Sequence, residues 1–177
     1  MKFLPTTKEE MKNLGWDSID VLLISGDTYL DTSYNGSALI GKWLVEHGFK
    51  VGIIAQPEVN VPDDRARLGV PNLFFAVSGG CVDSMVANYT ATKKRRQQDD
   101  FTPGGVNNKR PDRAVLVYSN MIRRFFKGTT KKIVISGIES SLRRITHYDY
   151  WTNKLRKPIL FDAKADILSY GMGEMSM

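Results

Sequence analysis

The stretch DVLLISGDTYLDTSYNGSALIGKWLVEHGFKVGIIA, residues 20–55, has a compact apolar run at each end, with turn residues and an amphipathic segment between them. Short apolar runs of this kind are typical of buried strands. The amphipathic segment is predicted to be a helix that Ser37 caps and Gly48 ends. Strand, helix and strand within about 35 residues form a βαβ unit with a right-handed crossover. The predicted apolar face of the helix consists of Leu39, Ile40, Trp43 and Leu44.

The alternation of strands and helices continues along the chain. Helices are predicted at 82–89 and 112–126, the second with Asp112 as a possible cap. Near-continuous apolar strands between helices indicate a parallel sheet covered on both faces. We therefore expect one three-layer α/β domain over residues 1–177, with a mainly parallel five-stranded sheet in the order 2-1-3-4-5. The third, fourth and fifth strands are expected at 72–78, 131–136 and 165–171.

Composition limits the class of protein. The chain has 177 residues, 42% of them hydrophobic, which suits a globular domain with its own core. No stretch approaches the roughly 20 apolar residues that span a bilayer. The N-terminus, MKFLPTTKEEM, lacks the apolar core of a signal peptide. We expect a cytoplasmic protein with no membrane partner.

The only cysteine of the sequence is Cys81. It excludes an internal disulfide and any zinc or iron–sulfur site built wholly from cysteines of this chain. Its position after a predicted strand and a Gly-Gly turn favours a small buried residue over a reactive thiol. The chain stops at GMGEMSM, just past the fifth predicted strand and without a covering helix, so we expect a fragment or a truncated form.

The chemistry is expected beyond the carboxyl ends of the strands, where open α/β sheets bind their ligands. Most of the segments that follow a predicted strand begin with glycine, which permits tight turns and close backbone approach. Asp27 and Asp31 there are compatible with Mg²⁺, but turn hydrogen bonds explain them better, and no metal ligand is predicted. The candidate residues of a substrate or cofactor cleft are Gly26, Asp27, Tyr29, Asp31, Ser78, Gly79, Gly80, Gly137, Glu139, Arg143, Arg144, His147, Gly171, Gly173 and Glu174.

The segment GIESSLRRITHYDYW (137–151) combines a carboxylate, arginines and aromatic rings directly after the fourth strand. One interpretation is an anion-holding or domain-docking surface, because arginine offers a bidentate fork and large rings suit interfaces. The other is structural, with Glu139 paired to Arg143 or Arg144 and the rings in the core. His147 is expected to be structural in either case, since no second histidine lies nearby.

The charge and the missing motifs narrow the partners. The formal net charge is +6, and the loop at 90–111 contains the basic run Lys93, Lys94, Arg95 and Arg96, which suits a polyanion or a solvated surface. Neither GxGxxG nor GxxxxGK[ST] occurs, so the phosphate-cradling loops of dinucleotide and nucleotide binders are absent. The cluster motif CxxxCxxC is absent as well.

Six stretches carry a family resemblance, and together they span almost the whole chain. They are FLPTTKEEMKNLGWD (3–17), ALIGKWLVEHGFKVGIIAQP (38–57), DSMVANYTATKKRRQQDDFTPGG (83–105), RPDRA (110–114), GIESSLRRITHYDYW (137–151) and KADILSYGMGE (164–174). In these stretches the chain resembles the N-terminal region of the YgiQ-type radical-SAM proteins, a bacterial family of uncharacterised function. The stretches at 83–105 and 137–151 are the most specific.

The resemblance implies that a radical-SAM barrel follows this region in the same polypeptide. Three cysteines of the barrel bind a [4Fe–4S] cluster that reductively cleaves S-adenosylmethionine, and this sequence does not contain them. We therefore expect no cofactor bound by this chain alone and no radical chemistry. The resemblance also implies a flavodoxin-like, Rossmann-type domain similar to cobalamin-binding domains. GDTYLD (26–31) replaces their lower-ligand motif DxHxxG, which argues against a histidine-ligated cobalamin.

Three functions remain open from the sequence. The first is an accessory domain of a radical-SAM enzyme that forms part of the substrate or cofactor cleft or docks the catalytic barrel; the substrate stays unknown. The second is a nucleic-acid-binding module based on TATKKRRQQ (90–98) and the nearby rings. The third is a flavodoxin-like small-molecule binder that acts alone on a nucleotide or a flavin.

Overall fold

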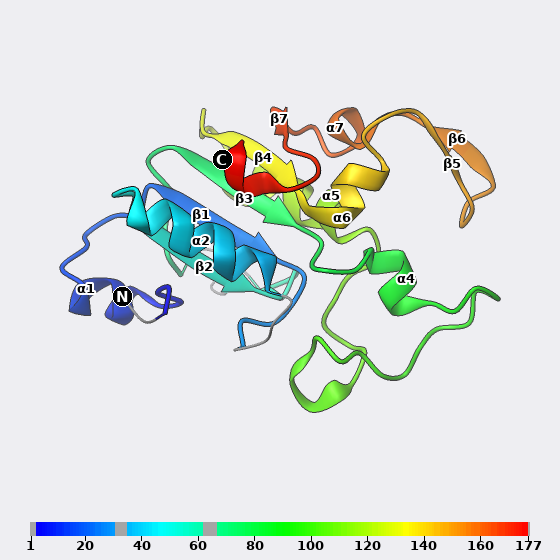
Figure 1. The fold of residues 1–177 in the computed structure, drawn as a ribbon, viewed down its shortest axis with the longest axis horizontal. Coiled ribbons are helices and arrows are strands. Elements are labelled where there is room, and N and C mark those ends of the chain that lie inside the picture. Colours follow the sequence, from blue (N-terminus) through cyan, green and yellow to red (C-terminus); the bar gives the residue numbers. More distant parts are fainter. Residues whose placement is uncertain (1–2, 31–34, 62–66, 177) are drawn as a thin grey trace.

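Five parallel strands form the central sheet of the computed structural model, which describes residues 3–30, 35–61 and 67–176 (Figure 1). Their order is β2-β1-β3-β4-β7, and every neighbouring pair is parallel. Because β7 is the fifth strand of this sheet, the predicted order 2-1-3-4-5 is confirmed. The strands are β1 (Val21–Ser25), β2 (Val51–Ala55), β3 (Phe74–Ser78), β4 (Lys132–Ser136) and β7 (Ile167–Leu168).

Helices cover both faces of the sheet, which makes the three layers expected from near-continuous apolar strands. On one face, α2 (Gly36–Glu46) packs on β1 and β2, and its Leu44 is buried with Leu23. On the other face, α5 (Ala114–Phe125) packs on β3, with Tyr118 and Ile122 in the larger core cluster. The α/β, flavodoxin-like fold class is thereby confirmed.

The packing of α2 differs from the face that the sequence predicts. Leu39 and Trp43 are 54% and 40% exposed, whereas Gly41 is buried against the sheet. A Cβ at Gly41 would lie 2.3 Å from Leu4 Cδ1, so the helix lies close to its neighbours along a glycine rather than along the larger side chains. The cap prediction is also wrong, since Asn35 and not Ser37 accepts the hydrogen bond from Ala38 N–H.

The predicted cap of α5 is wrong as well. Asp112 does not cap α5, because its carboxylate accepts hydrogen bonds from Asn88 and Tyr89 instead.

Shorter helices surround the sheet. The short helices are α1 (Lys8–Asn13), α4 (Ser84–Asn88), α6 (Gly137–Leu142) and α7 (Ile159–Asp162), with 3-10 turns η1 (Pro103–Gly105) and η2 (Gly173–Met175). Among the described residues, no helix has the length and apolar character needed to cross a membrane.

Two irregular parts of the chain meet at one end of the molecule. The strands β5 (His147–Asp149) and β6 (Lys154–Arg156) form an antiparallel hairpin outside the main sheet. The long loop between α4 and α5 carries two isolated bridges, Tyr89 with Arg95 and Gln98 with Val106. The fifth strand of the main sheet is shorter than the predicted 165–171, because only two of its residues pair with β4 before the chain turns at Gly171.

Candidate functional site at the carboxyl rim of the sheet

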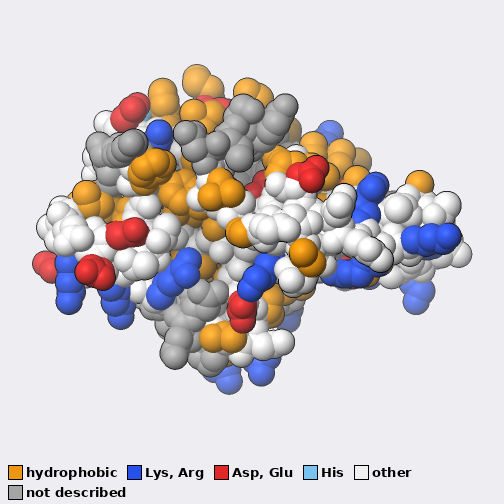
Figure 2. Space-filling model, turned by 90° about the horizontal axis from the view of Figure 1, so that it is seen from below, with side chains coloured by type: hydrophobic (Ala, Val, Ile, Leu, Met, Phe, Trp, Pro, Cys, Tyr) orange, Lys and Arg blue, Asp and Glu red, His pale blue; other side chains and the backbone are white. Residues whose placement is uncertain are grey.

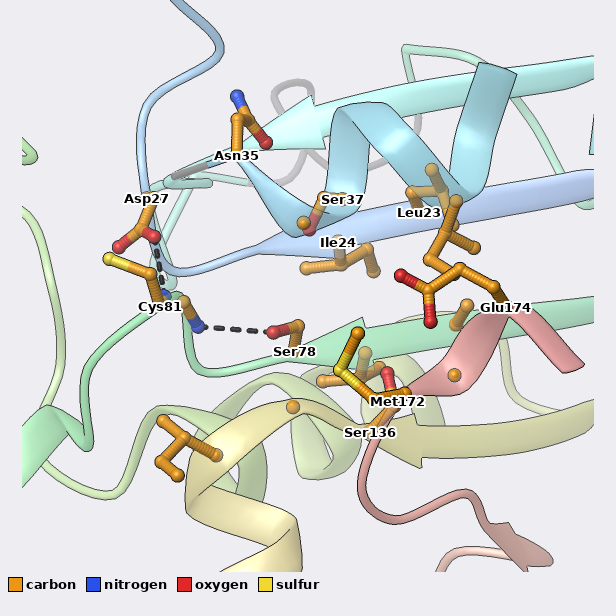
Figure 3. A pocket seen from close by; sticks show the side chains of 18 of the residues that line it. Leu23, Ile24, Asp27, Asn35, Ser37, Ser78, Cys81, Ser136, Met172 and Glu174 are labelled. Atoms are coloured by element: carbon orange, nitrogen blue, oxygen red, sulfur yellow. Dashed lines mark hydrogen bonds between the residues drawn. The ribbon is translucent and has the colours of Figure 1, made fainter. Parts of the chain in front are cut away.

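A cavity of about 230 Å³ lies beyond the carboxyl ends of β1, β3 and β4 (Figure 3). Its walls come from these strand ends, from the first turn of α2 and from the C-terminal segment 171–174. β2 and β3, the next two strands of the chain, lie on opposite sides of β1 in the sheet. The direction of the strand order therefore reverses between β1 and β3, and the cavity lies at this topological switch point. Open α/β sheets bind ligands at this place.

The cavity has an apolar floor and a polar rim. Leu23, Ile40 and Ala76 supply aliphatic surface from two strands and from α2. The rim carries the hydroxyl-bearing residues Ser37, Ser78 and Ser136, and Glu174 stands on the C-terminal segment. The first turn of α2 adds backbone N–H groups and the positive end of the helix dipole. The cavity therefore suits a ligand, or part of one, with an apolar body and a polar edge.

Glycines allow the corners after β1 and β3 to touch at this rim. A Cβ at Gly26 would lie 2.1 Å from the carbonyl oxygen of Gly79, so backbone approaches backbone there. Gly80 has φ +109°, and a Cβ on it would lie 2.2 Å from Asp27 Oδ1. A side chain at either position would displace the corner that places Asp27 at the cavity.

A buried ion network holds Asp27 in position. Arg110 is fully buried; its Nη2 lies 2.8 Å from Asp27 Oδ1, and its Nη1 donates to Gly79 O at 2.9 Å. Asp99 is the second carboxylate of the network, 3.4 Å from Arg110 Nη2. The other oxygen of Asp27 accepts from Cys81 N–H at 2.6 Å. The network ties the long loop to the rim through residues distant in sequence, and both oxygens of Asp27 have protein partners.

Cys81 lines the cavity as a neutral thiol. Burial, followed by the charge of Asp27, raises the pKa of the Cys81 thiol to about 12. The thiolate is the form that attacks electrophiles and binds metals, and it is scarce at neutral pH with such a pKa. The described residues also contain no group of three or more His, Cys, Asp or Glu side chains placed to hold a metal ion.

Glu139 lies behind the rim and caps two helices instead of pairing with an arginine. It is buried, its Oε2 accepts from Ser84 N–H at 3.1 Å, and its Oε1 accepts from Val115 N–H at 3.3 Å. These two N–H groups lie in the first turns of α4 and α5. Burial raises the pKa of Glu139, and the hydrogen bonds from Ser84 oppose that rise. The pairing of Glu139 with Arg143 or Arg144, which belonged to one of the two interpretations of this segment, is therefore not found.

The arginines of the same segment serve other partners. Arg143 forms an ion pair with Asp83, the N-cap residue of α4. Arg144 is exposed, donates to Ser141 O at 2.8 Å and stacks on the ring of Tyr170. His147 lies in β5, where its Nδ1 is 3.1 Å from Ile145 O. The helix of this segment starts at Gly137 itself, directly after β4.

The structure thus brings together about half of the residues predicted for the cleft. Tyr29 is turned toward the N-terminus, where its hydroxyl accepts from Leu4 N–H, and Asp31 lies outside the described residues. Gly26 and Gly79 support the rim, whereas Glu139, Arg143, Arg144, His147 and the basic run at 93–96 do not line the cavity. The predicted residues that line it are Asp27, Ser78, Gly80, Gly137, Gly171, Gly173 and Glu174.

Sequence reasoning missed the contribution of α2, the aliphatic residues of β1 and β3, and four residues that lie beside glycines. Asn35, Gly36 and Ser37 form the first turn of the helix that follows β1, and a helix in that position begins at the ligand-binding edge of such a sheet. That rule was sufficient to find them. Cys81, Ser136, Ile138 and Met172 each lie beside a glycine and carry no comparable pattern.

Comparison with known proteins adds the family. The sequence model of the family described as "Radical SAM N-terminal" matches residues 3–177. A UPF0313 protein of Fusobacterium nucleatum is 97% identical over the whole chain, and UPF0313 proteins of Thermotoga neapolitana and Methanocaldococcus jannaschii are 60% and 55% identical over 99% of it. No solved structure matches the chain.

The relatives are much longer than this chain. It spans 31% of the Fusobacterium protein, 30% of the Thermotoga protein and 28% of the Methanocaldococcus protein. These shares agree with a further domain in the same polypeptide of the relatives. The match confirms the resemblance seen in the sequence. Because the family model covers nearly every residue and the relatives are so similar, this chain belongs to the radical SAM N-terminal family.

Proposed function

We propose that this chain is the accessory domain of a radical-SAM enzyme, and that the cavity at the carboxyl rim forms part of the cleft for its substrate or cofactor. The observation that carries the proposal is the position of the cavity at the switch point, with an apolar floor and a polar rim. The relatives are long enough to contain a second domain that would complete such a cleft.

The size of the cavity favours a shared cleft over a complete binding site. Ligand pockets usually have volumes of roughly 300–1,000 Å³, whereas this one has about 230 Å³. A cavity of this size accommodates part of a substrate or cofactor, and a second domain would enclose the remainder. The role of this chain would then be to bind and orient the ligand and to keep water from it.

Exposed apolar side chains beside the cavity support docking of a second domain. Met172 and Met175 are 81% and 94% exposed on the C-terminal segment, and Leu142 at the end of α6 is 58% exposed. Tyr170 lies in the same segment and is also exposed. Surfaces that combine methionine and aromatic side chains are typical of interfaces.

The [4Fe–4S] cluster implied by the family does not fit this chain. Such a cluster is held by several thiolates, and the sequence supplies only Cys81, whose pKa is raised. The cluster and S-adenosylmethionine chemistry are therefore assigned, within this proposal, to the part of the longer polypeptide that this chain does not include.

The test fills the cavity in the full-length Fusobacterium relative. Ser37→Trp places a ring at the cavity wall, and Leu39→Trp places the same ring on the exposed side of α2. After cluster reconstitution, formation of 5′-deoxyadenosine from S-adenosylmethionine should fall at least about ten-fold in Ser37→Trp, because small displacements of bound groups are costly. Leu39→Trp should keep the rate. Equal rates in both variants, at equal iron content, would contradict the proposal.

The cavity also favours, as a second candidate, a small-molecule binder that acts alone. That function requires the 177-residue chain to bind its ligand without a second domain. Thermal shift with nucleotides and flavins distinguishes the two candidates. A rise in Tm of the wild-type chain that is absent in Ser37→Trp would support the stand-alone binder and displace the accessory role.

A further inference from the structure

The basic loop and the aromatic hairpin, separated by some fifty residues of sequence, form one surface. Tyr150 Oη donates to Ala91 O at 2.8 Å, and Lys93 Nζ lies 4.5 Å from the centre of the Tyr150 ring. The rings of Tyr89 and Trp151 are 5.4 Å apart, and Arg95 lies over Tyr89. These contacts join residues 89–96 to the β5–β6 hairpin. We call residues 89–96 and 144–157 together the basic–aromatic surface.

The positive charge of the protein is concentrated on this surface. Its two segments contain eight lysine and arginine residues and one acidic residue, so their net charge of +7 exceeds the +6 of the whole chain. The acidic residue, Asp149, is buried and forms ion pairs with Arg113 and Arg156, and Asp112, which lies outside the two segments, pairs with Arg95. Figure 2 shows Lys and Arg side chains gathered over the projecting end of the molecule where Figure 1 places the hairpin. The surface is distant from α1 at the opposite end.

Aromatic faces are exposed among these cations. Tyr148 and Tyr150 are 59% and 49% exposed, and the neighbouring strand presents Leu155 opposite Tyr148. In β5 the alternation of the strand buries Asp149 and turns Tyr148 outward. All four residues of the basic run 93–96 are exposed. Rings and cations are thus interleaved in space, although they are separate in the sequence.

We propose that the basic–aromatic surface binds single-stranded nucleic acid. Proteins that bind single strands combine cations along the backbone with rings on which bases stack, and both are present here. A double helix is a poorer match, because this surface offers a short loop and a hairpin with exposed rings rather than an element that enters a groove. This inference goes beyond the proposed accessory function and uses no residue of the cavity.

The first experiment measures binding of the full-length Fusobacterium relative and of the 177-residue chain to labelled 20-nucleotide RNA and DNA of mixed sequence by fluorescence anisotropy. Binding at about 50 mM salt should weaken steeply as salt rises, with a slope near −0.7 for each phosphate neutralised. Lys93→Ala/Lys94→Ala should reduce the affinity at least about five-fold and lower the slope. The matched control is Lys8→Ala/Lys12→Ala, which removes the same charge from α1 and should leave the affinity and the salt slope unchanged. Comparison of the affinities for RNA and for DNA shows which of the two nucleic acids the surface prefers.

The second experiment separates stacking from charge. Tyr150→Leu removes the ring and should reduce the affinity about five-fold or more, since stacking of bases on aromatic rings contributes to the binding of single strands. Tyr150→Phe keeps the ring, loses only the hydroxyl bond to Ala91, and should bind as the wild type does. No binding at about 50 mM salt, or equal losses in the α1 control, would overturn the proposal. Binding by the short chain but not by the longer relative would do the same, because it would show the surface covered by protein. None of these outcomes bears on the Ser37→Trp test.

Discussion

Arg110 and Lys94 both lie in the basic loop at 90–111, yet one is buried and the other is exposed. Arg110 is fully buried between Asp27 and Asp99. Lys94 is exposed on the basic–aromatic surface. The comparison teaches that a run of cations is not one functional unit. Arg110 holds the loop on the sheet, whereas the cations near 94 are exposed to solvent.

The largest expected effect comes from Arg110. Arg110→Met leaves Asp27 and Asp99 buried without their shared cation, so the free energy of unfolding should fall by about 3–5 kcal/mol. Urea denaturation of the chain, followed by circular dichroism, measures the change. Arg110→Lys retains the charge but lacks the fork that reaches Gly79 O, and an intermediate loss is expected. A loss below about 1 kcal/mol for Arg110→Met would show that the buried arginine is not what holds the loop.

A smaller, pH-dependent effect is expected at Asp149. Burial opposes ionisation, but the hydrogen bonds from Arg113, Thr152 and Arg156, together with the charge of Arg113, hold the pKa of Asp149 well below its usual value of 3.8. A carboxyl group with a depressed pKa in the folded state stabilises the fold above its unfolded pKa, and this contribution is lost as the pH falls through the folded pKa.

The test compares the wild type with Asp149→Asn by urea denaturation at neutral pH and at about pH 3. The variant should be less stable at neutral pH, and the gap to the wild type should narrow in acid. A gap that stays constant, or that widens in acid, would show that ionised Asp149 does not stabilise the hairpin.

The smallest effect on stability is expected at Lys94. Because Lys94 is exposed, Lys94→Ala should change the free energy of unfolding by no more than about 0.5 kcal/mol. The same denaturation assay provides the measurement. A loss comparable with that of Arg110→Met would erase the distinction between the two ends of the basic segment.

The sheet could be predicted from the sequence because its determinants are local. Apolar runs such as 20–25 and 50–55 are buried on both faces, and a parallel connection requires a helix between them. The glycine-led corners followed from the same pattern. The carboxyl rim as a place could therefore be predicted, and so could several of the residues that line the cavity there.

The remaining contacts depend on partners that are distant in sequence. Nothing local distinguishes Arg110 from the exposed cations of its loop, since its burial requires Asp27, 83 positions earlier in the chain. The hairpin was missed because β5 and β6 have only three residues each and show no alternation long enough to recognise. The face of α2 was mistaken because a glycine, not a large apolar residue, makes its closest contact.

Glu139 has a consequence for the order in which the protein folds. Its two hydrogen bonds span 55 and 24 residues, so the carboxylate meets its donors only after α4, α5 and the segment after β4 have been brought together. Contacts of such sequence separation require loop closure before they contribute stability, and they slow folding. Because β3 and β4 pair across a comparable separation, from Phe74 to Lys132, the helix starts that Glu139 caps should become ordered together with the pairing of these strands.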